Sequence, residues 1–356
     1  MNKIGHSVHR NENQVKLIIH PGLGKSATTL LQNRVFALLG YHNLGKESLE
    51  DVSRKALRQE LFPSVSTKRQ FKKRFRNPKP EIERLAQYLR SEIASVVSEQ
   101  GTNTFVLSDE TMLTYGSPDI NFYRLTALAS RLRELLKSED SLSLEVGFSI
   151  TIRNQLTYLP AHYSYMFSRI GREFRNFDTF IKGVKSDPFK GAPGNLFFDS
   201  LFDAFSSFVP EGMSVRFVPY EIIFEQGSLA FGEKVLGIPR TGSTENGDGW
   251  MINANPGHKL RIERGSAKIH YHFSNGMRVL GERGFPLAPS LHRIFETKLI
   301  RGAFKANDSH RLSRKSAELT SDQVREISQI YGESNSRLGA ILGLDLSKFG
   351  YPVADI

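Results

Sequence analysis

The chain has 356 residues, 39% of them hydrophobic and 24% charged, which is enough to bury a substantial core as one large domain or two smaller ones. It contains no cysteine, which excludes disulfides, thiolate metal sites and a cysteine nucleophile. The formal net charge of +11 favours acidic partners.

The N-terminal residues 1–14 are polar and contain no apolar stretch of the kind that a secretory signal needs. Nowhere in the chain is there a run of about 18 apolar residues, the length that crosses a membrane as a helix. We therefore expect a cytoplasmic protein without a transmembrane segment.

The first predicted unit is a strand that feeds a helix through glycines. Residues 16–19 form an apolar strand, residues 20–25 a glycine-rich bend, and residues 26–39 a helix whose first turn carries hydroxyl groups. In such a bend, backbone N–H groups converge on an anion and the helix dipole adds partial positive charge. The residues expected to bind a phosphate or sulfate ester are Gly22, Gly24, Lys25, Ser26, Ala27, Thr28 and Thr29.

Helices and strands alternate through the middle of the chain. A helix with one apolar face is expected over 81–100, followed by a strand over 104–107. A helix over 121–137 then leads to a strand over 146–152 and a further helix over 156–169. This alternation predicts an α/β fold with a P-loop-like parallel sheet flanked by helices, and ligands at the carboxyl ends of its strands.

The C-terminal third has a less regular pattern. An amphipathic helix is expected over 195–208 and a strand over 214–218. Residues 242–289 begin with a stretch rich in glycine, asparagine and charge, and we expect an irregular insertion or an acceptor-side region there. Thr320 and Gln323 have the spacing of a capping box that opens the last long helix.

Two basic segments, over residues 68–79 and 301–315, concentrate positive charge. One interpretation is solvated surface. The other is capture of an anionic nucleotide, a polysaccharide or a phospholipid headgroup, the last as peripheral association with an anionic membrane surface. No helix-turn-helix, finger or RNA-platform pattern accompanies the charge, so no specific nucleic acid partner is expected.

The spacing of the glycine-rich bend separates two kinds of phosphate loop. The ATP- and GTP-binding P-loop needs Gly-x-x-x-x-Gly-Lys-Ser/Thr. Residues 24–26 fit its second half, but Ile19 stands where the first glycine would fall. The run over 20–32 more closely resembles the 5′-phosphosulfate loop of sulfotransferases, especially bacterial carbohydrate sulfotransferases, with Ala27 where that family usually has glycine.

The resemblance continues in order along the chain. Residues 105–110 resemble the family's apolar strand ending in Ser-x-Glu, and residues 148–163 resemble the strand and helix that grip the nucleotide 3′-phosphate. Residues 215–221 resemble a later strand and residues 319–338 the family's C-terminal helix. Because the matches span nearly the full length, a single sulfotransferase-like domain is expected over 1–356.

The resemblance implies 3′-phosphoadenosine 5′-phosphosulfate (PAPS) as the donor and a hydroxyl of a carbohydrate, glycolipid or other glycoconjugate as the acceptor. Lys25 would pair with the leaving phosphate and the transferred sulfonate. Glu110 would be the general base, with His20 as an alternative; Asp109 and Glu110 could instead form an acidic pair at a helix N-terminus. Sulfonate transfer does not intrinsically need a metal, so none is expected.

Arg153 closes an apolar strand, and the family uses an arginine there against the 3′-phosphate, a task that suits bidentate geometry. The alternative is an ion pair with a surface carboxylate. The family's usual partner serine is replaced by Ala161, and Ser164, almost one helical turn later, is the candidate substitute. Arg301 resembles the basic loop that closes over the same phosphate in some relatives.

Two other functions fit the same residues. A Mg²⁺-dependent P-loop nucleotide hydrolase or kinase would use the lysine loop and hold its metal at Asp109 and Glu110. A non-catalytic relative that binds anionic glycans would keep the fold without turnover, which Ala27 and Ala161 suggest.

Overall fold

The structure is a computed structural model of the 356-residue chain. It describes residues 13–23, 26–44, 78–109, 111–114, 118–170, 174, 176–189, 192–238 and 317–354. These residues belong to two compact units. The first contains the described residues up to 155 together with those of 189–238 and 327–354, and the second contains those of 156–188 and 317–326.

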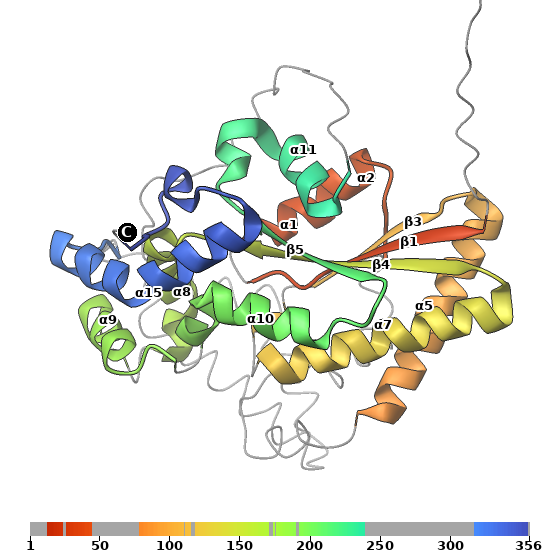
Figure 1. Ribbon diagram of the computed structural model, residues 1–356, viewed down its shortest axis with the longest axis horizontal. Helices are drawn as coiled ribbons and strands as arrows, with labels where there is room; N and C mark the ends of the chain where they lie inside the picture. Colours follow the sequence, from red (N-terminus) through yellow and green to blue (C-terminus); the bar gives the residue numbers. More distant parts are fainter. Residues whose placement is uncertain are drawn as a thin grey trace, which may run out of the picture. The chain divides into compact units, whose positions relative to one another are not determined.

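A five-stranded parallel sheet of order β2-β3-β1-β4-β5 lies at the centre of the first unit (Figure 1). Its strands are β1 (Gln14–His20), β2 (His42–Asn43), β3 (Thr104–Ser108), β4 (Ser143–Ile152) and β5 (Met213–Pro219). Leu17, Ile18 and Ile19 of β1 are fully buried, as expected for a central strand covered on both faces. The predicted α/β fold with a parallel sheet is confirmed, and among these strands only the short β2 was not predicted.

Helices cover both faces of this sheet (Figure 1). One face carries α1 (Thr28–Leu30), the π-helical η1 (Leu31–Val35), α2 (Phe36–Leu38) and α11 (Ile222–Leu236). The other carries α5 (Lys79–Gln100), α7 (Pro118–Asp140) and α10 (Phe198–Phe208). On the first face the packing is close, since a Cβ at Gly232 of α11 would lie 2.2 Å from Cγ1 of Val35 in η1.

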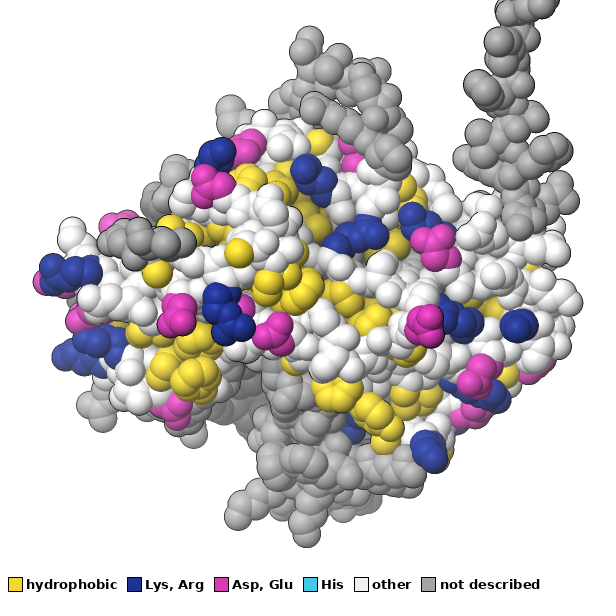
Figure 2. Space-filling view, in the orientation of Figure 1, with side chains coloured by type: hydrophobic (Ala, Val, Ile, Leu, Met, Phe, Trp, Pro, Cys, Tyr) yellow, Lys and Arg dark blue, Asp and Glu magenta, His cyan; other side chains and the backbone are white. Residues whose placement is uncertain are grey.

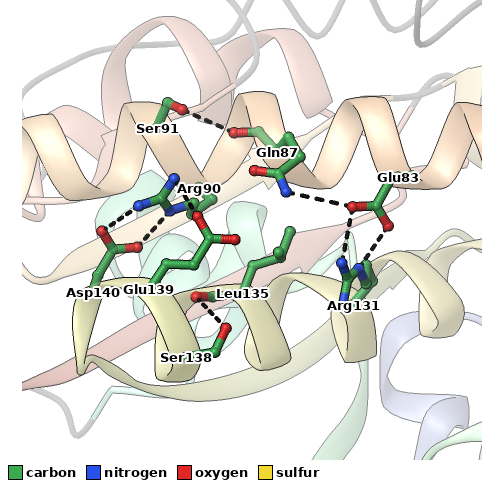
Figure 3. A network of polar contacts seen from close by, with 9 residues as sticks. All are labelled: Glu83, Gln87, Arg90, Ser91, Arg131, Leu135, Ser138, Glu139 and Asp140. Atoms are coloured by element: carbon green, nitrogen blue, oxygen red, sulfur yellow. Dashed lines mark hydrogen bonds and ion pairs between the residues drawn. The ribbon is translucent and has the colours of Figure 1, made fainter.

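Bidentate ion pairs join α5 to α7 (Figure 3). Arg90 places its Nε and Nη2 at 2.7 and 2.8 Å from the two carboxylate oxygens of Asp140. Arg131 places its Nε and Nη2 at 2.6 and 2.9 Å from the two oxygens of Glu83. Paired hydrogen bonds of this kind specify orientation as well as proximity. The two helices that flank β3 in the sequence are thereby fixed against each other.

The second unit is built around aromatic side chains. It contains nearly all of α8 (Gln155–Ile170), all of α9 (Phe177–Ser186) and the first residues of α15 (Ser321–Leu342). The Tyr163 ring packs against Phe177 and Phe180, each at a centroid separation of 5.3 Å. Asn176 caps α9, its side chain accepting from the Thr179 N–H at 2.8 Å. The packing of Tyr163 against the two phenylalanine rings stabilises this small core.

The predicted capping box at the start of α15 is confirmed. The Thr320 N–H donates to Gln323 Oε1 at 2.9 Å, and the Gln323 N–H donates to Thr320 Oγ1 at 3.3 Å. These reciprocal bonds satisfy two backbone donors that a helix end otherwise leaves unpaired.

Other helix predictions need correction. The predicted helix over 195–208 is wrong at its start, because a 3₁₀ turn, η2 (Ala192–Leu196), precedes α10. Gly194 sits so close to the chain that a Cβ would lie 2.4 Å from the Phe189 carbonyl oxygen, which disfavours any other residue there. The helices α9 and α11 were not predicted; α11 contains Gly227 at φ 83°, which interrupts its helical pattern.

None of the described helices is long and apolar enough to cross a membrane. On the face shown in Figure 2, cationic and anionic side chains are interspersed across the described surface. The predicted insertion over 242–289 and the basic segment over 301–315 lie outside the described residues, as does the first basic segment except for its last two positions. The single domain predicted over 1–356 stays a prediction.

Candidate functional site

The carboxyl ends of β1 and β3 are neighbours at a point where the chain leaves the sheet in two directions. After β1 the chain continues into α1 and η1 on the α11 face, and after β3 it continues into α7 on the α10 face (Figure 1). In parallel α/β sheets, the crevice outside such diverging strand ends is the usual place for a ligand.

A chain of buried polar side chains links three strand ends at this edge. His20 of β1 has its Nδ1 2.8 Å from Ser108 Oγ of β3 and its Nε2 2.8 Å from Thr151 Oγ1 of β4. The Gln32 amide donates to the Ser108 carbonyl oxygen at 2.7 Å and to Ser108 Oγ at 3.1 Å. The two His20 bonds are shielded from water and the two Gln32 bonds are partly shielded, so together they hold the strand ends in a fixed relation.

His20 is fully buried, and burial lowers its pKa from 6.5 to about 4. The imidazole is therefore neutral at neutral pH, and a hydroxyl oxygen occupies hydrogen-bond distance from each of its nitrogens. A general base has to come within hydrogen-bond reach of the proton that it removes. This geometry gives His20 the task of holding the strand ends and speaks against the alternative role of base that the sequence suggested.

The described part of the loop after β1 leaves no room for a side chain at Gly22. A Cβ there would lie 2.3 Å from Thr28 Oγ1 and 3.5 Å from His20 Cε1. The Gly22 N–H donates to the His20 carbonyl oxygen at 3.0 Å, and the buried Ser26 hydroxyl donates to the Leu23 carbonyl. The loop therefore folds back tightly, and the Ser26 hydroxyl is engaged in shaping it.

Ala27 has a left-handed backbone, with φ 61° and ψ 13°. Its carbonyl accepts from the N–H groups of Leu30 and Leu31 at 2.9 and 3.1 Å, so this conformation starts the helical segment. For an L-residue with a side chain the left-handed region costs about 1–2 kcal/mol. The position where this chain departs from the resembled loop is thus one where glycine would be free of strain.

Thr28 is 3% exposed, and its hydroxyl has no hydrogen-bond partner among the described residues. Leaving a buried hydroxyl unsatisfied costs about 1–3 kcal/mol. This hydroxyl lies where a side chain at Gly22 would begin, so the glycine makes room for the hydroxyl itself. An anionic oxygen would supply the missing acceptor, so Gly22 and Thr28 fit the expected phosphate or sulfate ester. Thr29, by contrast, is exposed.

Arg153 follows β4 and Tyr220 follows β5, and the Tyr220 N–H donates to the Ile152 carbonyl oxygen at 2.7 Å. The Arg153 guanidinium carbon lies 5.0 Å from the centroid of the Tyr220 ring, and Arg153 is 9% exposed. A cation over an aromatic face is held in a restricted orientation. Such burial does not suit the alternative of an ion pair at the surface.

Glu221 connects this region to the segment after α15. Its Oε1 accepts from the Asn154 N–H at 2.9 Å, and its Oε2 accepts from the Tyr351 hydroxyl at 2.8 Å. Burial raises the pKa of Glu221, opposed by these two hydrogen bonds and by the charge of Arg153. Burial also raises the pKa of Tyr351 well above its usual range, so that its hydroxyl keeps its proton.

Side-chain amides join residues 154 and 155 to α15 and to the segment that follows it. Asn154 Nδ2 donates to the Gly350 carbonyl oxygen at 2.5 Å. Gln155 and Asn335 exchange two hydrogen bonds, at 2.9 and 3.0 Å, and Asn335 Nδ2 also donates to the Pro352 carbonyl oxygen at 2.7 Å. We refer to residues 153–155 as the Arg153 turn.

Ser164, the candidate substitute for the family's phosphate-binding serine, lies in α8 within the second unit. Its hydroxyl donates to the Pro160 carbonyl oxygen at 2.8 Å, and Ala161 is buried. A serine hydroxyl bonded to the preceding helical turn is a common helix feature. Its proposed contact with a phosphate stays a prediction.

Gly24, Lys25, Glu110 and Arg301 lie outside the described residues. The residue before Glu110 is described, however, and the Asp109 N–H donates to the His20 carbonyl oxygen at 3.3 Å.

No family model, curated protein or solved structure matches this chain.

No role was predicted from the sequence for Ser108, Thr151, Tyr220, Glu221 or Tyr351. A local signal was available for the first four, because a polar residue at the end of an apolar strand points to a ligand site or a buried polar chain. No local signal marks Tyr351, since its contact with Glu221 joins residues that are 130 positions apart.

Proposed function

We propose that this protein is a sulfotransferase that transfers a sulfonate group from PAPS to a hydroxyl of a carbohydrate or glycoconjugate. The observation that carries the proposal is the loop after β1, where Gly22 makes room for a buried Thr28 hydroxyl that has no partner among the described residues. A loop of this kind at diverging strand ends favours a tetrahedral anionic group.

The proposed reaction breaks the bond between sulfur and the 5′-phosphate oxygen and forms a bond between sulfur and the acceptor oxygen. Negative charge then develops on the leaving phosphate, where Lys25 would stabilise it together with N–H groups of the loop. The acceptor's proton goes to a base, for which we propose Glu110, since Asp109 lies against the loop. His20 would hold the loop and the strand ends in place.

Arg153 supports the choice of donor. PAPS carries a 3′-phosphate that ordinary nucleotides lack, and a guanidinium fork matches two phosphate oxygens at once. Its stacking on Tyr220 restricts the orientation of that fork. We propose that Arg153 recognises the 3′-phosphate.

A Mg²⁺-dependent nucleotide hydrolase or kinase is the second candidate, and Asp109 favours it. Asp109 follows β3, the neighbour of β1, and its backbone N–H donates to the carbonyl oxygen of His20, the residue before the loop. P-loop nucleotide hydrolases hold Mg²⁺ with an aspartate of this kind together with a loop hydroxyl.

One assay separates the candidates. The protein is incubated with PAPS and a panel of oligosaccharides, and release of adenosine 3′,5′-bisphosphate is followed with and without EDTA, beside an ATP hydrolysis assay. Release that depends on an acceptor hydroxyl and persists in EDTA supports the sulfotransferase. Mg²⁺-dependent ATP hydrolysis without bisphosphate release favours the hydrolase or kinase, and binding of a sulfated glycan or PAPS without turnover favours the non-catalytic relative.

A further inference from the structure

The segment after α15, residues 343–354, makes several polar contacts around one turn of the candidate site. Gly350 and Pro352 offer their carbonyl oxygens to Asn154 and to Asn335, the amide partner of Gln155. Between them, Tyr351 is 2% exposed and donates its hydroxyl to Glu221. Three consecutive residues are thus bonded, directly or through one side chain, to the Arg153 turn and to the residue after Tyr220.

The two carboxylate oxygens of Glu221 accept hydrogen bonds from different places, one from the Arg153 turn and one from the segment after α15. One oxygen accepts from the N–H that directly follows Arg153 in the chain, and the other accepts from Tyr351. Glu221 also directly follows Tyr220, on whose ring the Arg153 guanidinium rests. Tyr351 is therefore hydrogen-bonded to the residue that accepts from the N–H after Arg153 and that directly follows Tyr220 in the chain.

We propose that Tyr351, acting through Glu221, is a positioning residue that holds Arg153 in the orientation that recognises the 3′-phosphate of the donor nucleotide. The inference rests on the proposed function, because it presumes the phosphate that Arg153 binds. A bidentate fork needs its two N–H groups placed within a fraction of an ångström, and supporting hydrogen bonds supply that placement. Tyr351 itself has no contact with the nucleotide in this proposal.

The test compares two nucleotides that differ in one phosphate. Titration calorimetry measures the dissociation constants of adenosine 3′,5′-bisphosphate and adenosine 5′-phosphate for the wild-type protein and for Tyr351→Phe. Losing one hydrogen bond in a supporting contact should weaken bisphosphate binding about fivefold. Binding of the 5′-phosphate should change less than twofold, since that nucleotide makes no use of Arg153.

Tyr331→Phe is the matched control. Tyr331 is also fully buried in the first unit, and its hydroxyl also donates to a buried oxygen, the Pro193 carbonyl at 3.2 Å. The control removes the same atom from the same kind of environment, so a general loss of stability would show in both variants. The ratio of the two dissociation constants should stay at its wild-type value in Tyr331→Phe.

Two further variants test the route through Glu221. Glu221→Gln keeps an acceptor for the Asn154 N–H and a partner for the Tyr351 hydroxyl, so it should retain most of the preference for the bisphosphate, whereas Glu221→Ala should lose it. In an Arg153→Ala background, Tyr351→Phe should have no further effect on bisphosphate binding, because the coupled residues share one contact.

The outcomes distinguish the positioning role from the proposed function. If Arg153→Ala lowers bisphosphate binding selectively and Tyr351→Phe does not, the positioning role is wrong and the donor assignment stands. If Arg153→Ala lowers binding of both nucleotides equally, the donor assignment fails and the positioning role fails with it. Should Tyr351→Phe not fold, loss of the preference in Glu221→Ala with recovery in Glu221→Gln still supports the role, and equal preference in both variants overturns it.

Discussion

The loop after β1 and the Arg153 turn lie at the same edge of one sheet, yet they differ in whether their buried polar groups have hydrogen-bond partners. In the loop, a buried hydroxyl has no partner among the described residues and Ala27 has a strained backbone. In the Arg153 turn, Asn154 and Gln155 have partners from segments distant in the sequence, and so does Glu221, which accepts from the Asn154 N–H. In the proposed function a ligand would supply the partner that the loop lacks, whereas the turn is organised before any ligand binds.

The largest expected effect breaks the loop side of this comparison. Lys25→Ala removes the full charge beside the developing negative charge, so turnover with PAPS should fall by about 10²–10³-fold, and donor binding should also weaken. Steady-state kinetics measures the loss, with circular dichroism as the check on folding. Near-normal turnover in a folded Lys25→Ala protein would contradict the phosphosulfate loop.

The buried His20 side chain predicts that the free energy of unfolding depends on pH. The pKa of His20 is about 4 in the folded protein and 6.5 when exposed, so the unfolded state binds more protons between these values. The free energy of unfolding should therefore decrease as the pH falls from 6.5 to 4, and His20 alone should account for about 3 kcal/mol. Denaturant titrations across this range measure it.

His20→Gln is the comparison for that measurement, because glutamine keeps polar groups but does not titrate. The difference between the wild-type and His20→Gln stabilities should shrink as the pH decreases towards 4. Two curves that stay parallel over the range would show that His20 is not the buried neutral group described above.

Arg153→Ala tests the Arg153 turn, the other side of the comparison. Removing the fork should weaken adenosine 3′,5′-bisphosphate binding by about 2 kcal/mol, because charge-assisted bonds to a phosphate are lost. Adenosine 5′-phosphate should be much less affected, and calorimetry with both nucleotides gives the contrast. Equal losses would argue that the guanidinium serves the fold and not the 3′-phosphate.

Thr28→Val sharpens the comparison, since it should give opposite signs for stability and binding. Replacing an unsatisfied buried hydroxyl with a methyl group should raise the free energy of unfolding by about 1 kcal/mol. Binding of both nucleotides should weaken by a similar factor, because both carry the 5′-phosphate that the loop would hold. A destabilised Thr28→Val protein would reveal a partner for the hydroxyl in the free state.

Ala27→Gly has the smallest expected effect. Relief of the left-handed strain, offset by the greater freedom of glycine in the unfolded chain, should raise the free energy of unfolding by about 0.5 kcal/mol. Ala37→Gly is the control, because Ala37 is exposed in the neighbouring helix α2 and glycine there should cost about 1 kcal/mol. Thermal melts of both variants give the signs, and destabilisation of both would contradict the strain at Ala27.

The sequence predicted the sheet well because its strands are short apolar runs between clear turn and helix signals. It predicted α5 from the apolar spacing of one face, and the Thr320 cap from two residues, since both features are local. It missed α11, where Gly227 interrupts the pattern, and the start of α10, where close chain packing at Gly194 decides the geometry. For the candidate site, Thr28 and Arg153 could be named from their positions after strands, but the partner of Glu221 could not.

The His20 imidazole also couples the opening motions of the three strand ends. Because His20 is bonded to Ser108 on one side and to Thr151 on the other, β1 cannot separate from either neighbour at this edge without exposing a buried ring nitrogen. Amide protons near the three strand ends should therefore exchange with solvent in one concerted opening, with a common free energy. Any ligand that tightens the loop would then slow exchange as far away as the end of β4.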